Sequence, residues 1–314
     1  MTTHSASQEQ NSIWADEDKA RTMRLRVKTF YNTDYFDRII LPLLNVPQAR
    51  RVLDVGCGYG GLSLLLARAR PDLHITGVDV ETGALESAAK SAAQDNLVNV
   101  NFEPSDAHQL KFKDSQFEAV VCQTLLTHVR DAEEVMREMA RVLMPGGVFM
   151  AAEYTLSGAW SAYDNVSDSK RDEAWHQECF RVRRLYNQGK LALGSGDQRL
   201  GVRVPLLATA VGLNVFDFRL NDRALHVIPP YDHPKQEDYL ELLRVMYASG
   251  LDRKRLAHNI ETLRAAGGAE EDAHWLNSAV DTSALRKAIE EGTLTMLSAD
   301  RLYLTFARKP NPQE

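Results

Sequence analysis

The sequence predicts an α/β fold in which helices cover both faces of a seven-stranded, mostly parallel sheet. Between residues 51 and 155, short apolar runs alternate with amphipathic helical segments, the pattern of a parallel sheet that is buried on both faces. The first of these runs leads directly into a glycine-rich turn and then into a helix. With 314 residues, 44% of them hydrophobic, the chain is long enough to bury a sizeable core.

The expected elements follow one another in a regular order. Apolar runs predict strands at residues 52–55, 74–78, 99–103, 117–122, 148–153, 213–220 and 302–307. Amphipathic segments predict helices at residues 62–70, 83–94, 132–143 and 204–211. Thr82 and Asp131 are expected as N-caps, because their side chains can accept a hydrogen bond from a first-turn amide. The segment Pro145–Gly147 is expected to end the third helix and lead into the fifth strand.

Three regions are expected along the chain. Residues 1–50 form an N-terminal helical lid segment, residues 51–155 form the ligand-binding core, and residues 156–314 complete the sheet. The third region carries helical insertions near 156–195 and 225–298 that are expected to lie over a substrate. The roughly 80 residues between the sixth and seventh strands are far more than a hairpin connection needs.

Charge and cysteine content narrow the function classes. Acidic residues outnumber basic ones by 43 to 37, whereas nucleic acid and anionic membranes are normally met by a basic face. We therefore expect no nucleic-acid partner and no membrane partner. The three cysteines have neither zinc-site nor disulfide spacing, and the polar first residues lack the apolar stretch of a signal peptide. The expectation is a cytoplasmic protein without a metal.

The strongest functional signal is the glycine-rich turn after the first strand. Gly56, Gly58 and Gly61 have the spacing of a dinucleotide-binding turn. Asp54, two residues before the first glycine, would repel the pyrophosphate of a dinucleotide. The same carboxylate suits the ammonium and sulfonium groups of S-adenosyl-L-methionine. The sequence therefore favours that cofactor, and an NAD(P)-dependent oxidoreductase is the alternative from another class.

Acidic residues also follow the second and third expected strands. Asp79, in the segment from Gly77 to Val80, can accept both hydrogen bonds of a ribose diol, and Asp106, followed by Ala107, can accept one from an adenine amine. The structural alternatives are a helix cap at Asp79 and a turn former at Asp106. Three acids after three successive strands favour a single ligand site at one edge of the sheet.

These motifs together resemble those of the class I S-adenosylmethionine-dependent methyltransferases that modify small molecules. The segments Phe117–Gln123 and Arg141–Gly147 resemble the family's fourth strand and the turn before its fifth, and the resemblance covers about residues 30–155. It implies a Rossmann-like sheet of strand order 3-2-1-4-5-7-6, with strand seven antiparallel. It also implies cofactor-binding roles for the following residues: Asp54, Gly56 and Gly58 (methionine part), Asp79 (ribose), Val80, Asp106 and Ala107 (adenine side), Gln123 (strand-four side) and Tyr31. Tyr31 would close over the cofactor, and a core aromatic on an amphipathic helix is its alternative.

Two residues are candidates for the chemical step. His128 follows the fourth strand and Glu153 ends the fifth, so both are expected at the rim where ligands bind in open α/β sheets. Glu153 is expected to face the transferring methyl group. His128 is a candidate general base for a hydroxyl acceptor, and a histidine that anchors the turn at residues 126–131 is the alternative.

The insertions provide candidate acceptor-binding residues. Trp160, Tyr163 and Tyr231 suit a cationic or soft acceptor, and Arg223 can hold its carboxylate. Core positions are the alternative for the aromatic residues. The resulting hypothesis is a small-molecule acceptor of amino-acid type that is methylated on nitrogen or sulfur, such as the thioether of methionine. An O-methyltransferase of a secondary metabolite is the alternative, and a homodimer is an open option.

Overall fold

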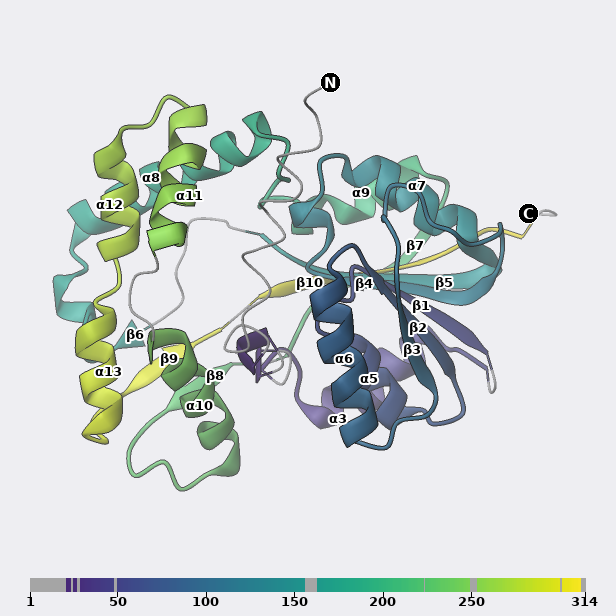
Figure 1. The fold of residues 1–314 in the computed structure, drawn as a ribbon, viewed down its shortest axis with the longest axis horizontal. Helices are drawn as coiled ribbons and strands as arrows, with labels where there is room; N and C mark the ends of the chain where they lie inside the picture. The colour runs from purple at the N-terminus through teal and green to yellow at the C-terminus, as the bar shows by residue number, and fades with distance from the viewer. Residues whose placement is uncertain are drawn as a thin grey trace.

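The computed structural model describes residues 21–23, 25–26, 29–47, 50–155, 163–222, 224–248, 253–299 and 301–311. Its central feature is a seven-stranded sheet of order β3-β2-β1-β4-β5-β10-β7 (Figure 1). The strands are β1 (Arg51–Val55), β2 (His74–Asp79), β3 (Val100–Pro104), β4 (Phe117–Gln123), β5 (Leu143–Tyr154), β7 (Asn214–Leu220) and β10 (Leu302–Arg308). Neighbours from β3 to β5 pair in parallel, and β10 is antiparallel to both β5 and β7. The predicted fold class and strand order are confirmed.

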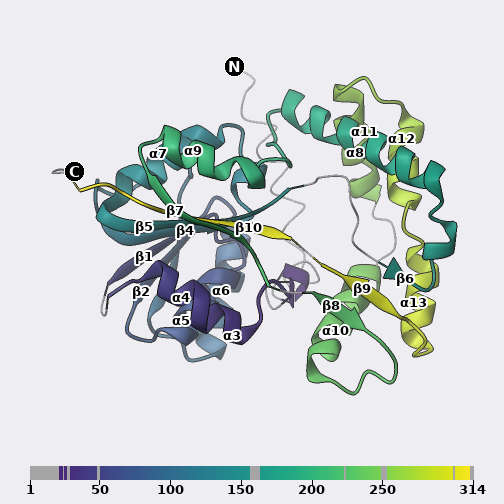
Figure 2. The same cartoon turned by 180° about the vertical axis from the view of Figure 1, so that it is seen from behind.

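Helices cover both faces of this sheet (Figure 2). One face carries α3 (Thr33–Tyr35), the π-helix η2 (Phe36–Ile40), α4 (Leu41–Leu44), α5 (Gly61–Ala69) and α6 (Thr82–Gln94). The other face carries α7 (Ala132–Val142) and α9 (Val204–Ala210). Each face therefore has a helical layer against which the apolar strand residues can be buried.

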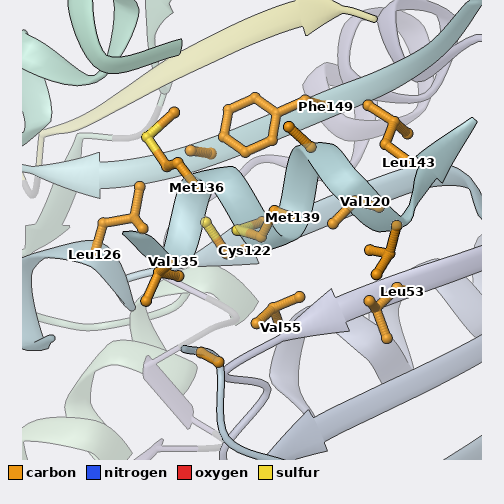
Figure 3. Packing of buried hydrophobic residues seen from close by; sticks show 14 of the residues in the cluster. Leu53, Val55, Val120, Cys122, Leu126, Val135, Met136, Met139, Leu143 and Phe149 are labelled. Atoms are coloured by element: carbon orange, nitrogen blue, oxygen red, sulfur yellow. The ribbon is translucent and has the colours of Figure 1, made fainter. Parts of the chain in front are cut away.

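The two faces have separate apolar cores because side chains alternate along each strand. Leu53, Val120 and Phe149 belong to the core on the α7 side, where they pack with Met136 and Met139 (Figure 3). Their chain neighbours in the same strands belong to the core on the α5 side: Val52, Val121, Val148 and Met150. Both residues of each neighbouring pair are buried, which is why these strands read as continuous apolar runs.

Two local predictions about helix ends had different outcomes. Asp131 caps α7, since its Oδ1 accepts a hydrogen bond from the N–H of Glu134 at 3.0 Å. The prediction that Thr82 caps α6 is wrong, because Thr82 is the first residue of that helix and Glu81 precedes it as N-cap without a side-chain bond. Asp79 organises this turn instead, because its Oδ1 accepts the N–H of Glu81 at 3.0 Å.

The fifth strand is longer than expected. α7 ends at Val142 and β5 begins at Leu143, so the segment predicted as a helix-ending turn lies inside a 12-residue strand. Gly146 and Gly147 exchange backbone hydrogen bonds with Lys309, beyond the end of β10. The backbone pairing between the C-terminal segment and β5 therefore continues toward the beginning of β5.

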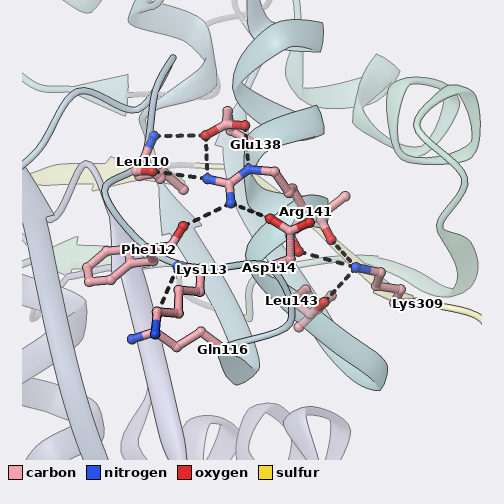
Figure 4. Close-up of polar contacts among 10 residues, drawn as sticks. Leu110, Phe112, Lys113, Asp114, Gln116, Glu138, Arg141, Leu143 and Lys309 are labelled. Atoms are coloured by element: carbon pink, nitrogen blue, oxygen red, sulfur yellow. Dashed lines mark hydrogen bonds and ion pairs between the residues drawn. The ribbon is translucent and has the colours of Figure 1, made fainter.

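Arg141 ties the end of α7 to the loop that precedes β4 (Figure 4). Its guanidinium donates to Glu138 and Asp114 and to the carbonyl oxygens of Leu110 and Phe112, at distances from 2.7 to 3.0 Å. Such a forked set of donors fixes the loop at the edge of the sheet where β4 begins.

A second group of elements lies beside the sheet, and it contains strands that the sequence did not predict. A three-stranded antiparallel sheet of order β6-β9-β8 is built from β6 (Tyr163–Asp164), β9 (Met296–Ser298) and β8 (Leu225–Val227). The helices of this region are α8 (Glu173–Ala192), α10 (Pro234–Ala248), α11 (Arg253–Ala265), α12 (Glu270–Ser278) and α13 (Thr282–Glu290). Strands of two or three residues are too short to give a hydrophobic period. None of the helices in the described ranges combines the length and the apolar character needed to cross a membrane.

Candidate active site

A cavity of about 500 Å³ opens at the carboxyl ends of β1, β2 and β4. Asp54, Asp79 and Gln123 line it from these three strands. Further walls come from the N-terminal segment, from the loop after β4 and from helices α8 and α11. Segments far apart in the sequence thus meet at the edge of the sheet where an open α/β fold binds its ligand.

The glycine-rich turn forms the floor of this cavity, and Gly56 and Gly58 line it as predicted. Gly56 has a φ of +69°, and a Cβ at this position would lie 2.5 Å from Cδ1 of Leu125 in the loop after β4. The turn therefore needs a residue without a side chain, both for its backbone conformation and for its close approach to that loop. α5 begins directly after it, at Gly61.

Asp54 presents a carboxylate oxygen that has no partner. The side chain is buried, and its Oδ2 accepts a hydrogen bond from Oγ of Ser63 at 2.6 Å. Its Oδ1 is also buried, and no donor reaches it from any residue that the structure describes. Burial raises the pKa of Asp54 to about 7, against the lowering effect of Ser63. A buried acceptor without a donor in a cavity wall suits a cationic or donating ligand group.

Asp79 lines the cavity at the end of β2, beside the exposed side chain of Val80. Its Oδ2 accepts the N–H of Gly58 at 2.8 Å, and its Oδ1 accepts the N–H of Glu81. Each carboxylate oxygen has a second lone pair, so both remain able to accept from a diol. Asp79 therefore organises the two turns around the cavity and can also meet a ligand.

Gln123 lines the cavity, whereas Tyr31 supports it from behind. The Tyr31 hydroxyl donates to Oε1 of Gln123 at 2.9 Å, and its ring packs against Phe36 with a centroid separation of 5.9 Å. Phe30 is the aromatic residue of this segment that contributes to the wall. The arrangement matches the alternative reading of Tyr31 as a core aromatic, with the added role of orienting the Gln123 amide.

Asp106 and Ala107 do not line the cavity that the structure describes. The Asp106 side chain is 60% exposed, and its Oδ1 accepts the N–H of His108 at 2.9 Å. Ala107 is buried in the core on the α7 side. Asp106 thus behaves as the turn former that was its alternative reading, since a short aspartate side chain readily bonds the backbone two residues on.

The expectation that Glu153 faces the transferring methyl group is wrong. Glu153 is fully buried and absent from the cavity wall, and its Oε1 accepts the N–H groups of Leu125 and Leu126 at 2.8 and 2.7 Å. Its Oε2 accepts from Oγ1 of Thr127 at 3.1 Å. The carboxylate turns toward this loop because the 3₁₀-helix η3 (Leu126–His128) begins there and leaves its first N–H groups without helical partners. Glu153 is therefore a positioning residue.

His128 lines the cavity but is poorly suited to act as a base. Burial, and after it the positive charges of Lys190 and Arg26, lower its pKa to about 3. Nε2 lies 3.3 Å from the Tyr154 hydroxyl oxygen and Nδ1 lies 3.5 Å from Nζ of Lys190. At neutral pH the imidazole is therefore uncharged and engaged on both nitrogens, which matches the anchoring alternative.

Two predicted acceptor-binding residues, Trp160 and Arg223, lie outside the described residues. The other two are not in the cavity wall. Tyr163 lies in β6, and the Tyr231 hydroxyl donates to the carbonyl oxygen of Leu294 at 2.9 Å. Both belong to the region of the small sheet, since Tyr163 is in β6 and Tyr231 follows β8. Acceptor binding by Tyr163 and Tyr231 therefore stays a prediction.

Three basic residues in the wall were missed by sequence reasoning. Arg26 comes from the N-terminal segment, Lys190 from α8 and His258 from α11. The only sequence signal at Lys190 is a lysine set among apolar and small residues near the end of a helix. That signal is weak, because a lysine stem often lies along apolar surface with its charge in water.

Comparison with known proteins relates residues 48–200, which include strands β1 to β5, to methyltransferases. A family profile described as a methyltransferase domain matches residues 48–200. The chain is 33% identical over 129 residues to the sterol 24-C-methyltransferase erg6 of Aspergillus fumigatus. The aligned residues make up 41% of this chain and 33% of that protein. It is 35% identical over 122 residues to the ubiquinone/menaquinone biosynthesis C-methyltransferase UbiE of Desulfotalea psychrophila, 39% of this chain and 48% of that one. The chain thus spans less than half of the length of these two relatives.

Solved structures share the fold at low sequence identity. The YcgJ protein of Bacillus subtilis has a TM-score of 0.51 and 18% identity, with 88% of this chain and 99% of that chain covered. The [4+2]-cyclase SpnF has a TM-score of 0.50 and 18% identity, with 88% of this chain and 81% of that chain covered. At this identity the likeness concerns the fold, and the reaction has to be argued from the cavity.

Proposed function

Residues 48–200 belong to the class I S-adenosylmethionine-dependent methyltransferases, and from this premise we propose that the chain transfers a methyl group from S-adenosyl-L-methionine to a small acceptor. The observation that carries the proposal is that Asp54 lines the cavity and that its buried Oδ1 has no hydrogen-bond donor among the described residues. An ammonium group of the cofactor would supply that donor. A dinucleotide pyrophosphate would instead bring negative charge to a buried carboxylate, which argues against the oxidoreductase alternative.

Different residues of the cavity floor are proposed to bind different parts of the cofactor. Asp54 would hold the ammonium group, and Asp79 would accept from the ribose hydroxyls. Val80 and Gln123 would bound the cofactor on its two sides. When bound, S-adenosyl-L-methionine supplies an electrophilic methyl group on a sulfonium. The chain itself orients the acceptor in line with that methyl and excludes water. Good orientation alone can lower the activation free energy by roughly 7–11 kcal/mol.

The acceptor is proposed to be methylated on oxygen. Nitrogen or sulfur of an amino-acid-type compound was the first hypothesis, but two of the aromatic residues that supported it, Tyr163 and Tyr231, do not line the cavity. The wall carries Lys190 and Arg26 instead. A thioether would become a cation beside these two positive groups, whereas the same groups favour the deprotonated form of a hydroxyl acceptor, which releases its proton to solvent before transfer and gives a product without positive charge. The charge of the wall therefore favours the O-methyltransferase alternative.

The N-terminal segment, α8 and α11 are proposed to form a lid over the cofactor and acceptor. Each contributes a wall residue, and Asn32 is tied to the segment just after β7, because its N–H and its Nδ2 donate to the carboxylate of Asp222 at 3.1 and 2.8 Å. Covering the site would exclude water during transfer. The homodimer and the cytoplasmic location stay predictions.

The proposal is tested by binding and turnover together. Calorimetry should detect S-adenosylmethionine and S-adenosylhomocysteine binding, and NADH should not bind. A methyl-release assay with labelled cofactor should then favour hydroxyl and phenol acceptors over amines and thioethers. Binding of NADH without binding of either sulfur cofactor would reject the methyltransferase proposal, and preferred turnover of a thioether would reject the oxygen acceptor.

A further inference from the structure

We propose that Lys190, with Arg26 in the same cavity wall, binds an oxyanion of the acceptor, so that the substrate is a small organic acid or phosphate ester. This inference rests on the proposed function, because it names the acceptor class for the same cavity. It is carried by the burial of Lys190, by its weak polar contacts and by the other charges of the wall.

Lys190 is a buried ammonium in the cavity wall, with only 5% of the residue exposed. Its Nζ lies 3.4 Å from the Thr127 carbonyl oxygen and 3.5 Å from Nδ1 of His128, both at the outer limit of hydrogen bonding. An ammonium has three hydrogens to donate. No carboxylate comes within ion-pairing distance of Nζ in the described part of the chain. Its hydrogen-bonding capacity is therefore incompletely used inside the protein.

The charges around Lys190 do not neutralise it. Arg26 adds a second positive charge to the wall, and His128 is uncharged at neutral pH. The acidic residue that acts on the pKa of Lys190 is Asp197. Its carboxylate already accepts a hydrogen bond from Asn187 at 3.0 Å and is paired with Arg199 and Arg203. A buried cation in such surroundings is costly unless a ligand brings a counter-charge.

The position of Lys190 is fixed by the way α8 ends. Ser195 donates its backbone N–H to the Lys190 carbonyl oxygen at 2.9 Å, so the chain folds back directly after the lysine. Gly196 follows with a φ of +100°, and a side chain there would overlap the Thr127 carbonyl oxygen. This glycine lets the end of α8 pack against η3 without a gap. The ammonium is thus held beside Thr127 and His128.

The acidic and basic wall residues come from different elements. Asp54, Asp79 and Glu81 belong to β1, β2 and the turn that follows, and they surround the proposed cofactor position. Lys190 and Arg26 come from α8 and the N-terminal segment. An acceptor with an oxyanion would place its negative charge at these two cations, away from the carboxylates that hold the cofactor.

The test measures binding of three small probes to the full chain by calorimetry, with and without S-adenosylhomocysteine. Benzoate and phenyl phosphate carry the two oxyanions, and benzamide is the neutral shape match of benzoate. We expect the wild type to bind at least one of the two anions about 10- to 100-fold more tightly than benzamide, the range of a charged hydrogen bond. The tighter of the two anions identifies the acceptor as a carboxylate or a phosphate.

Matched variants separate Lys190 from general surface charge. Lys190→Met should abolish the preference for the anion and leave S-adenosylhomocysteine affinity unchanged, while Lys190→Arg should keep most of it. Lys287→Met is the control, because this lysine is 74% exposed on α13. A preference that survives in Lys190→Met, or wild-type binding of both anions no tighter than benzamide, would overturn the inference.

A measurement on the wild type alone guards against misfolded variants. Burial lowers the pKa of Lys190 to about 8, against the raising effect of Asp197. Anion affinity should therefore fall about tenfold between pH 7 and pH 9 as the ammonium loses its proton, and benzamide affinity should stay constant. An anion affinity that does not change over this range contradicts the role of Lys190. Failure to bind S-adenosylhomocysteine would reject the proposed function alone, because the anion preference is also measured without it.

Discussion

The carboxylate of Glu153 accepts a hydrogen bond from the backbone N–H of Leu126 across 2.7 Å. This bond joins the end of β5 to the start of η3, two elements that are separated by helix α7 in the chain. Together with the bonds from Leu125 and Thr127 it fixes the loop that carries His128 into the cavity wall. Glu153, near the end of β5, thus shapes the site by fixing the backbone of the loop after β4.

The first prediction concerns Glu153→Gln. The amide keeps one oxygen for the N–H groups of Leu125 and Leu126 but directs an NH₂ group at the N–H of Thr127. We expect the free energy of unfolding to fall by about 1–3 kcal/mol at pH 5. Denaturant titration measures it, with Glu133→Gln on the exposed face of α7 as control.

The pH dependence of this effect has a definite sign. Burial raises the pKa of Glu153 to about 7 from an ordinary value of 4.5. Because the pKa of Glu153 is higher in the folded than in the unfolded chain, its contribution to the free energy of unfolding is fully present below pH 4.5. That contribution is lost as the pH rises through 7. The difference between wild type and Glu153→Gln should therefore shrink between pH 5 and pH 8. An equal difference at both values would show that Glu153 does not titrate in this range.

The second prediction concerns Asp54→Asn. Removing the charge should weaken S-adenosylmethionine binding about 10- to 100-fold, because a hydrogen bond to a charged group is lost. Since the pKa of Asp54 is raised to about 7, wild-type affinity should increase from pH 6 to pH 8 as the carboxylate forms. Calorimetry checks both effects, with Glu86→Gln on the exposed side of α6 as control. Unchanged affinity in Asp54→Asn would remove the basis of the proposed cofactor site.

The third prediction concerns the pair Tyr31 and Gln123. Tyr31→Phe removes the donor to Oε1 of Gln123, and should reduce cofactor affinity by about three- to tenfold by releasing that amide. In a double-mutant cycle with Gln123→Met the two effects should not add, and the coupling energy should be about 0.5–1.5 kcal/mol. Additive effects would mean that Tyr31 acts on the cofactor independently of Gln123.

The fourth prediction concerns the lid. Hydrogen exchange should slow on binding of S-adenosylhomocysteine in residues 21–35, near the end of α8 and in α11, because these segments supply Phe30, Lys190 and His258 to the wall. α12 serves as an internal comparison, since it contributes no wall residue. Mass spectrometry of peptic fragments measures the change. Protection confined to residues 54–81 would contradict closure of the lid.

The sheet and the floor of the cavity could be predicted from local patterns in the sequence. The sheet strands alternate between two buried faces and are separated by amphipathic helices, so their order followed from the apolar runs and the resemblance of the turns. Asp54 and Asp79 reach the cavity because each lies in or at the end of a parallel strand, and parallel strands end at one edge. These features depend on neighbours within a few residues in the chain.

The walls above that floor depend on contacts between distant segments. Whether Glu153 faced the cavity or the loop after β4 was decided by the unpaired N–H groups of η3, which no pattern around residue 153 indicates. Lys190 reaches His128, 62 residues away in the chain, because the end of α8 folds back onto η3. Asp106 has the residue type expected of an adenine contact, yet bonding to His108 turns it toward solvent. Side-chain direction and the meeting of remote helices are set by tertiary packing, since the free energy of burying or pairing a group depends on what surrounds it.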